Sequence, residues 1–588
     1  MEATTSPVST TDRIDRMVRA TVARWTASIS PASLQLAWND WAAHLAGAPG
    51  KRLELLRLGL LQMRDLANYA AHCALPGADP EANPCCVTAH PGDRRFREPE
   101  WNQWPFNVLQ QSFLMTERLW EQATHGVPGV EKHHEDVVGF VARQWLDMWS
   151  PGNQLLTNPV VLKQTLQQGG TNLLRGWLNG LDDLDRLVTG MPPAGTEDFA
   201  VGRNLAVTPG KVVMRNRLVE LIQYAPSTAQ VRPEPILIVP AWIMKYYILD
   251  LSPHNSLIRY LVDQGHTVFC ISWKNPDADD RDLGMEDYLQ LGVMAALDAV
   301  NAIMPKQPVH AVGYCLGGTL LSVAAAAMAR DDDHRLASVT LFAAQTDFTE
   351  PGELGLFIDE SQVSLLEAQM AQTGYLTAQQ MAGAFQMLRS YDLLWSRLVG
   401  EYLMGTRRPM NDLMAWNADA TRMPARMHSE YLRRLFLDND LAEGRFPVGG
   451  RPVALSDIAL PMFCVGTQTD HVAPWRSVYK LHYLTVADLT FVLTSGGHNT
   501  GIVSEPGHPH RSYQLLRRAA GSAYLGPDAW LEQVPLHDGS WWPAWLHWLD
   551  EHSGAPVDPP RMGNPRAGYR PLADAPGQYV REAYRIID

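Results

Sequence analysis

The chain has 588 residues, of which 46% are hydrophobic, and its formal net charge is −14 at pH 7. This length exceeds that of one ordinary domain and permits a large buried core, while a negative charge spread without any basic stripe argues against nucleic-acid binding. The cysteines form no disulfide-like framework, no apolar run reaches the about 20 residues of a membrane span, and no export signal opens the sequence, so we expect a cytoplasmic protein.

Residues 1–205 are predicted to form a mainly helical N-terminal domain. Apolar residues recur at helical spacing over 53–69 and 106–120. Between these runs, residues 74–98 are rich in Pro, Gly and charge and are expected to form an exposed connection. The run His133-His134-Glu135-Asp136 resembles a set of metal ligands, but adjacent side chains on a helix diverge. A solvated charged face is the stronger interpretation, and no metal is expected.

Residues 206–588 are predicted to form a catalytic domain of the α/β class. Short β-rich apolar runs alternate there with helical stretches, which is typical of a parallel sheet covered on both faces. An insertion of roughly 110 residues between the fourth and fifth runs is too long for a plain loop, so we expect a helical cap at about 348–455. From residue 558 the chain is predicted to be extended. The predicted strands are 236–239, 267–272, 309–312, 338–342, 462–465 and 489–493.

The sharpest local signal is Gly313-Tyr314-Cys315-Leu316-Gly317-Gly318. It lies between a predicted strand and a predicted helix, which is the context of the nucleophile elbow in the α/β-hydrolase fold, with cysteine in place of serine. The helix N-terminus favours a thiolate at Cys315, and the backbone N–H of Leu316 is placed to donate to an oxyanion. The alternative is an inert buried cysteine at a crossing of small residues.

Two later loops supply the partners of a catalytic triad. Hydrolases of this fold carry nucleophile, acid and histidine in that chain order, with the last two on loops after late strands. Asp470 follows the strand 462–465, and His498 follows the strand 489–493 in a glycine-rich loop. We therefore predict that His498 takes the thiol proton of Cys315 and that Asp470 orients the imidazole.

Three assignments stay open. Asp347 follows the strand 338–342 and is a competing acid, because some hydrolases carry the acid one strand earlier. A second oxyanion donor is expected on the loop after the strand 236–239, at Trp242 or Ile243. Trp416 lies in the predicted cap, where it either lines the closed site or fills the core.

These residues and several further motifs resemble the poly(3-hydroxyalkanoate) synthase family, specifically its long single-subunit, class I-like type. The likeness runs from about residue 95 to 550, and together the motifs are far more specific than any elbow. Besides the elbow, it is carried by the runs 240–251, 264–269, 272–277, Trp416-Asn-Ala-Asp-Ala-Thr421, Thr469-Asp-His-Val-Ala-Pro-Trp475 and Gly539-Ser-Trp-Trp-Pro543, and by 101–113 and 150–159 in the N-terminal domain.

The resemblance implies an acyltransferase that polymerises (R)-3-hydroxyacyl-CoA, with 3-hydroxybutyryl-CoA as the expected monomer, into polyhydroxyalkanoate and releases CoA. Cys315 would hold the growing chain as a thioester, His498 would activate the incoming group, and Asp470 would act on the 3-hydroxyl through the histidine. It also implies a homodimer, association with polymer granules and granule-associated proteins, and no cofactor beyond the CoA thioester substrate.

The sequence departs from the family after the histidine. The family usually continues with Ile-Ala-Gly and then Asn-Pro-Pro, whereas this chain has Asn499 and a different loop up to Gly507. A polar residue beside the catalytic position indicates a divergent branch and leaves the monomer chain length open.

Cysteine suits acyl transfer from CoA, because one thioester is exchanged for another and the step is nearly isoenergetic. Water must then be excluded so that a hydroxyl accepts the chain, which is a role for the cap. The alternative is a hydrolase with the same triad, either a thioesterase or an intracellular polyester depolymerase. A granule-associated scaffold without activity is a third hypothesis, against which the intact Cys/Asp/His set weighs.

Overall fold

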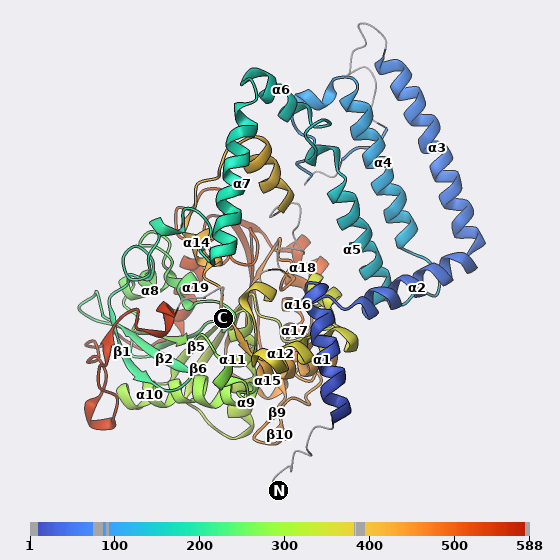
Figure 1. Ribbon diagram of the computed structural model, residues 1–588. Coiled ribbons are helices and arrows are strands. Elements are labelled where there is room, and N and C mark those ends of the chain that lie inside the picture. The colour runs from blue at the N-terminus through green and yellow to red at the C-terminus, as the bar shows by residue number, and fades with distance from the viewer. Residues whose placement is uncertain (1–9, 75–85, 90–92, 382, 384–393, 583–588) are drawn as a thin grey trace. The chain divides into compact units, whose positions relative to one another are not determined.

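The computed structural model describes residues 10–74, 86–89, 93–381, 383 and 394–582 (Figure 1). Its backbone contacts define two compact units. Unit 1 comprises residues 1–29, 195–382 and 410–588, and unit 2 comprises residues 30–194 and 383–409. The domain boundary at residue 205 and the limits of the cap remain predictions. In the part of the chain that is described, no helix combines the length and apolar character needed to cross a membrane.

Unit 1 is built on an eleven-stranded sheet with the order β14-β13-β12-β11-β6-β5-β3-β4-β2-β1-β15. The six strands from β12 to β4 run parallel, as predicted, and each matches one of the predicted apolar runs. The strands are β1 (Gly210–Arg215), β2 (Val219–Tyr224), β3 (Ile236–Val239), β4 (Val268–Trp273), β5 (Val309–Tyr314), β6 (Leu336–Phe342), β11 (Met462–Thr467), β12 (Leu489–Thr494), β13 (Ser512–Arg518), β14 (Leu536–Asp538) and β15 (Ala573–Asp574).

The sheet is mixed rather than wholly parallel, because both of its edges are antiparallel. These edge strands were not predicted for a physical reason. The strands β13 and β15 are partly exposed and β14 is exposed throughout, so they lack continuous apolar runs. The strand β2 is fully buried but carries Glu220, which pairs with Arg215 at 2.5 Å and so satisfies its charge inside the protein.

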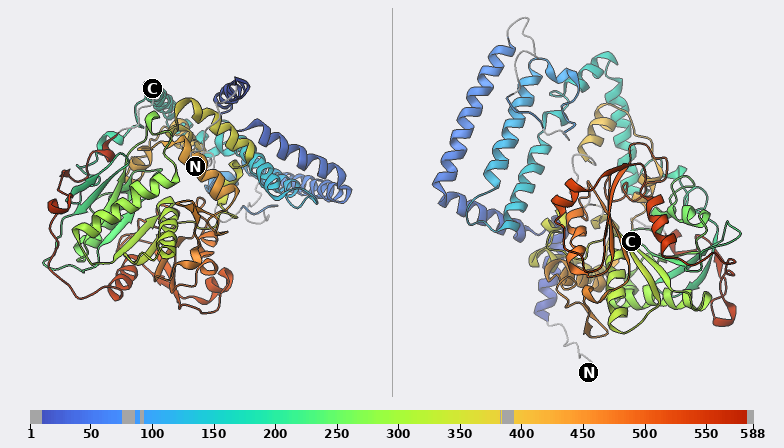
Figure 2. Two further views of the ribbon diagram at one scale, coloured as in Figure 1. Left: turned by 90° about the horizontal axis from the view of Figure 1, so that it is seen from below. Right: turned by 180° about the vertical axis from the view of Figure 1, so that it is seen from behind.

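Helices surround this sheet in unit 1 (Figure 2). The helix α11 is buried along almost its whole length, which explains its run of small and apolar residues. The helices of this part of unit 1 are α1 (Thr10–Trp25), α8 (Leu257–Asp263), α9 (Met285–Asp287), α10 (Ala295–Ile303), α11 (Leu316–Arg330), α16 (Trp475–Tyr479), α17 (Leu481–Leu484), α18 (Pro527–Gln533) and α19 (Trp542–Glu551).

The insertion between β6 and β11 is mainly helical. Within unit 1 its α12 packs against α1, where Arg19 Nη1 donates to Ser364 Oγ at 2.8 Å and Arg24 Nη2 donates to Gln372 Oε1 at 2.6 Å. The elements of the insertion are α12 (Glu360–Thr373), β7 (Tyr375–Leu376), the π-helical turn η10 (Leu398–Leu403), α14 (Asp412–Ala418), β8 (Met423–Pro424), α15 (Ala425–Tyr431), the π-helical turn η11 (Leu432–Leu437), β9 (Pro447–Val448) and β10 (Arg451–Pro452).

Unit 2 is helical, and the predicted helical runs lie within α3 and α4. The predicted connection over 74–98 lies partly outside the described residues. The helices of unit 2 are α2 (Pro31–Gly47), α3 (Pro49–Cys73), α4 (Phe106–Thr124), α5 (Lys132–Met148), α6 (Pro159–Gln167) and α7 (Thr171–Thr189).

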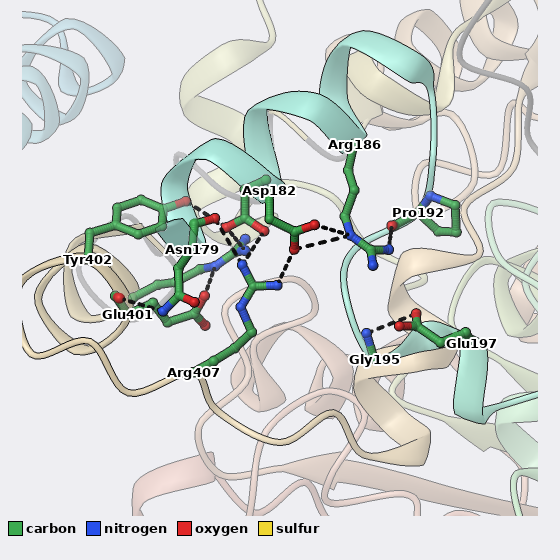
Figure 3. Close-up of polar contacts among 11 residues, drawn as sticks. Asn179, Asp182, Arg186, Pro192, Gly195, Glu197, Glu401, Tyr402 and Arg407 are labelled. Carbon is green, nitrogen blue, oxygen red and sulfur yellow. Dashed lines mark hydrogen bonds and ion pairs between the residues drawn. The ribbon is translucent and has the colours of Figure 1, made fainter. Parts of the chain in front are cut away.

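Part of the insertion is held on α7 inside unit 2. Arg407 donates to Asp182 Oδ2 at 2.7 Å and to the Asn179 carbonyl at 2.9 Å, and the Asn179 side chain donates to the Glu401 carbonyl at 2.9 Å (Figure 3). The two backbones almost touch: a Cβ on Gly176 would lie 1.7 Å from the Tyr402 carbonyl oxygen. The 394–409 segment and α7 therefore form one packed layer.

Candidate active site

The strand β5 ends one residue before Cys315, and α11 begins one residue after it. Cys315 has φ 53° and ψ −126°, a backbone conformation that L-residues rarely adopt and that the surrounding structure must enforce. Strand and helix approach so closely that a Cβ on Gly313 would lie 2.3 Å from the Gly318 Cα. A Cβ on Gly317 would lie 2.1 Å from the Val239 carbonyl oxygen. The elbow therefore needs its glycines, and it presents Cys315 at the C-terminal end of the parallel strands.

Asp470 and His498 meet at this same end of the sheet. His498 Nδ1 lies 2.8 Å from Asp470 Oδ2. The carboxylate is fixed from every side, because Thr467 Oγ1 also donates to Oδ2 at 2.8 Å, and the backbone N–H groups of Val472 and Ala473 donate to Oδ1 at 2.9 and 2.8 Å. Burial raises the pKa of Asp470, but His498 and these hydrogen bonds outweigh it, so the pKa lies below its ordinary value.

The imidazole of His498 is influenced by both Asp470 and Cys315. Burial lowers its pKa, yet the charges of Asp470 and Cys315 and a hydrogen bond to each side chain raise it, so the net pKa lies well above its ordinary value. Because Nδ1 faces Asp470, the other ring nitrogen is not engaged by the carboxylate. The three predicted side chains thus lie together at the C-terminal end of the parallel strands.

Asp347, the competing acid, is engaged elsewhere. Its Oδ1 accepts from the Thr349 backbone N–H at 2.8 Å and from the Thr349 hydroxyl at 2.5 Å, and Lys480 Nζ lies 3.5 Å away. The histidine bond goes to Asp470 instead. The geometry therefore favours Asp470 as the acid.

The predicted oxyanion residues lie around the elbow. Leu316 opens α11, so its amide belongs to the N–H groups of a helix start that lack an intrahelical acceptor. Trp242 and Ile243 are buried on the loop after β3, and within the described residues the Trp242 indole nitrogen finds no acceptor. Trp416 is buried and donates from its indole to the Lys245 carbonyl at 2.8 Å, so it supports this loop.

Sequence reasoning missed Tyr431, a buried residue of the insertion that packs beside the loop after β3. Burial raises the pKa of its hydroxyl well above the ordinary value, and Cys315 raises it further. Tyr431 ends α15 and packs its ring on Trp242 with centroids 6.5 Å apart. The helical pattern of the insertion was readable from the sequence, but which of its side chains would pack on Trp242 was not.

Two tryptophans that the sequence showed only as a motif hold the histidine loop. Trp541 Nε1 donates to the Gly501 carbonyl and Trp542 Nε1 to the Ile502 carbonyl, each at 2.9 Å. Both indoles are buried. Carbonyl groups of a loop need donors when they are buried, and these indoles supply them.

A metal centre does not form from the residues that are described, since no group of three His, Cys, Asp or Glu side chains is placed to hold an ion. In the His133–Asp136 cluster, His134 Nδ1 pairs with Asp40 Oδ2 at 2.8 Å, and Lys132 pairs with Glu135 and Asp136. These side chains are thus engaged in ion pairs.

Family models cover most of the chain. Residues 92–261 match the model described as the N-terminus of poly-beta-hydroxybutyrate polymerase (PhaC), and residues 9–51 match another described as poly-beta-hydroxybutyrate polymerase N terminal. Residues 234–504 match the alpha/beta hydrolase fold, which contains the elbow, Asp470 and His498.

Curated relatives are similar over nearly their whole length. The poly(3-hydroxyalkanoate) polymerase of Methylorubrum extorquens is 42% identical over 499 residues, which cover 84% of this chain and 82% of the relative. The poly(3-hydroxyalkanoate) polymerase subunit PhaC of Rhizobium meliloti is 38% identical and covers 83% and 79%. The corresponding subunit of Cupriavidus necator is 36% identical and covers 90% of each chain.

Proposed function

The chain belongs to the poly(3-hydroxyalkanoate) polymerase family and is an acyltransferase, and on this premise we propose that it polymerises (R)-3-hydroxyacyl-CoA through a thioester on Cys315. We propose 3-hydroxybutyryl-CoA as the monomer. The observation that carries the mechanism is the 2.8 Å contact between Asp470 Oδ2 and His498 Nδ1 at the end of the sheet where the elbow presents Cys315.

The first step is an exchange of thioesters. His498 takes the thiol proton of Cys315, and the sulfur attacks the carbonyl carbon of the acyl-CoA. A C–S bond to Cys315 forms and the C–S bond to CoA breaks, while the proton passes from His498 to the departing CoA sulfur. The amide of Leu316, with a second donor from the loop of Trp242 and Ile243, stabilises the oxyanion of the intermediate.

The second step extends the chain. The 3-hydroxyl of an incoming 3-hydroxyacyl-CoA attacks the carbonyl carbon on Cys315, a C–O ester bond forms, and the C–S bond to Cys315 breaks. The hydroxyl proton goes to His498 and then to the cysteine sulfur. Asp470 keeps Nδ1 of the imidazole occupied, so that the other nitrogen handles each proton. The lengthened chain, now on CoA, acylates Cys315 again and releases CoA.

Water competes with the hydroxyl in this second step. Cys315 is only 8% exposed, so little room is left for bulk water at the sulfur. This supports extension over hydrolysis. We propose that the insertion serves as the cap that excludes water from the acyl-enzyme.

The test is turnover of 3-hydroxybutyryl-CoA. We expect CoA release, followed with a thiol reagent, together with insoluble polyester that yields 3-hydroxybutyrate only after alkaline hydrolysis. CoA release with free 3-hydroxybutyrate and no polymer would replace the proposal by a thioesterase. Degradation of added polyester without use of acyl-CoA would replace it by a depolymerase.

A second experiment addresses the nucleophile. In Cys315→Ser the oxygen ester would be more stable than the thioester, so extension should nearly stop, and Cys315→Ala should abolish it. Retention of most CoA release by Cys315→Ala would exclude Cys315 as the acyl carrier.

The wider assembly is part of the same proposal. Family membership supports a cytoplasmic homodimer that needs no added cofactor and that works at the surface of its polymer granule. Size measurement by light scattering, before and after addition of substrate, tests the dimer, and co-sedimentation with the polymer tests the surface.

A further inference from the structure

Two side chains that flank the catalytic groups in sequence meet beside the imidazole. Tyr314 directly precedes Cys315, and Asn499 directly follows His498. We propose that Tyr314 and Asn499 form a positioning pair that holds the His498 imidazole in line with Cys315. This inference rests on the function proposed above and adds to it two residues that were given no role there.

The contacts of Tyr314 define the pair. Its hydroxyl donates to Asn499 Oδ1 at 2.5 Å and lies 3.3 Å from the His498 carbonyl oxygen. Its ring stacks on the His498 imidazole, with centroids 5.6 Å apart and planes inclined by 27°. One side chain thus contacts the backbone, the ring and the next residue of the catalytic histidine.

Each member of the pair is itself anchored. Tyr314 is the last residue of β5 and is buried, so its backbone belongs to the rigid centre of the sheet. The Asn499 carbonyl accepts from the backbone N–H groups of Ile502 at 3.1 Å and Val503 at 2.9 Å, so Asn499 begins a closed turn. The hydroxyl bond therefore ties the histidine loop to the strand that carries the nucleophile.

The chemistry of both groups suits this role. Burial raises the pKa of the Tyr314 hydroxyl well above its ordinary value, and the charges of Cys315 and Asp470 raise it further, so the hydroxyl stays protonated and remains a donor. The side-chain carbonyl of Asn499 is the acceptor. An apolar side chain at position 499 would leave the buried hydroxyl with the weaker contact to the His498 carbonyl.

The pair acts on an imidazole whose charge depends on its alignment. The ionisable groups that act on His498 are Asp470 from the loop after β11 and Cys315 from the elbow, with Tyr314 stacked on its face. The attraction of both charges falls off with distance, so a displaced ring is less readily protonated next to the sulfur.

The test compares Tyr314→Phe and Asn499→Ala with a matched control, Tyr479→Phe. Tyr479 is also a buried tyrosine, but its hydroxyl donates to the Leu525 carbonyl at 2.7 Å. Cys315 is alkylated with iodoacetamide at about pH 6.5 and at about pH 9, and mass spectrometry of its peptide follows the reaction. A thiolate paired with an imidazolium reacts at the lower pH, whereas a free thiol needs the higher pH. Unfolding is measured alongside.

The alkylation ratio is the rate of alkylation at the lower pH divided by the rate at the higher pH. For both pair variants we expect this ratio to be about 5- to 10-fold smaller than in the parent. We also expect kcat for CoA release to fall about 10-fold with KM little changed. Tyr479→Phe should change neither quantity, even if it lowers stability. The double variant should have about the same kcat as the slower of the two single variants, because both substitutions remove the same interaction.

An unchanged alkylation ratio together with a kcat within twofold of the parent in Asn499→Ala would overturn the proposal. Because Asn499 is a partly exposed loop residue, this variant tests the pair even if Tyr314→Phe does not fold. Multiplicative losses in the double variant would also overturn it. The alkylation measurement uses no acyl-CoA, so failure of the pair can be told apart from failure of the polymerisation proposal.

Discussion

Cys315 combines a strained backbone with close neighbours. Its positive φ and the contacts that a Cβ would make at Gly313 and Gly317 show that strand and helix leave no slack at the elbow. The backbone of Cys315 is consequently held at one place at the end of β5. At this scale, the decisive property of Asp470 is that both of its oxygens are occupied by donors, so the carboxylate cannot rotate away from the imidazole.

A pair of isosteric substitutions separates the two candidate acids. Asp470→Asn should lower kcat about 10³- to 10⁴-fold, because an amide at this place no longer stabilises the charged imidazole and can select the wrong tautomer. Asp347→Asn keeps the oxygen that accepts from Thr349 and should lower kcat less than about threefold. Initial rates of CoA release measure both. The assignment fails if Asp347→Asn is the slower variant.

At the scale of structural elements, the start of α19 supports the loop that carries His498. Trp541 and Trp545 are both fully buried at this end of the fold and both pack on Phe342, yet they serve different partners. The Trp541 indole donates to the histidine loop at Gly501, whereas the Trp545 indole donates to Thr340 Oγ1 in β6 at 3.2 Å.

This difference predicts a split between stability and activity. Trp541→Phe and Trp545→Phe should each lower the free energy of unfolding by about 1–3 kcal/mol, from lost contacts and a lost hydrogen bond. Trp541→Phe should also lower kcat about 10-fold, since the Gly501 carbonyl loses its donor and the histidine loop shifts. Denaturant unfolding and CoA release are measured on the same samples. Equal kcat values for the two variants would contradict the role given to Trp541.

A second element, α7, carries two glycines with opposite surroundings. A Cβ on Gly176 would collide with the Tyr402 carbonyl, whereas a Cβ on Gly180 would meet nothing within 4 Å. The contacts of Figure 3 hold the 394–409 segment on this helix, so the segment cannot retreat without breaking them.

We therefore expect Gly176→Ala to destabilise unit 2 by about 1–3 kcal/mol and to speed proteolysis within the 394–409 segment. Gly180→Ala, the control on the same helix, should be neutral or stabilise by up to about 1 kcal/mol, because alanine favours helix. Thermal unfolding and limited proteolysis provide the measurements. A stable Gly176→Ala with unchanged proteolysis would show that the packed layer does not exist in solution.

For the whole molecule, stability should depend on pH through buried histidines. Burial lowers the pKa of His310 to about 3, and that of His266 and His428 to about 4 each. These groups bind a proton in the unfolded chain below about pH 6.5 but not in the folded one. The contribution of these histidines to stability is therefore complete above about pH 6.5 and is lost as the pH falls toward their folded pKa values.

His310 allows a direct check, because its two ring nitrogens lie 2.7 Å from Ser338 Oγ and 3.1 Å from Ser553 Oγ. One such histidine contributes a slope of about 1.4 kcal/mol per pH unit. Between about pH 6.5 and 5 the parent should thus lose about 2 kcal/mol more than His310→Gln, even though the variant starts less stable. Denaturant unfolding at both pH values measures this. Parallel pH profiles would refute the linkage.

The sequence by itself determined the parallel centre of the sheet, the elbow and the family. Buried parallel strands are continuous apolar runs, a strained elbow needs its glycines, and residues such as Asp470 and His498 follow directly from strand ends, so each of these signals is local in the chain. The antiparallel edges were not predicted because β13 and β15 are partly exposed, β14 is exposed throughout, and β2 carries a buried Glu220.

Only the tertiary structure decided the rest of the site. The contact of Asp470 with His498, the packing of Tyr431 on Trp242, the indole bonds to the histidine loop and the contact of Tyr314 with Asn499 all join residues far apart in the chain. Their partners depend on how strands and helices pack and not on local spacing. From the sequence, Asn499 was only an unusual residue for the family. In the fold, β5 and the histidine loop lie together, and Asn499 accepts a hydrogen bond from Tyr314.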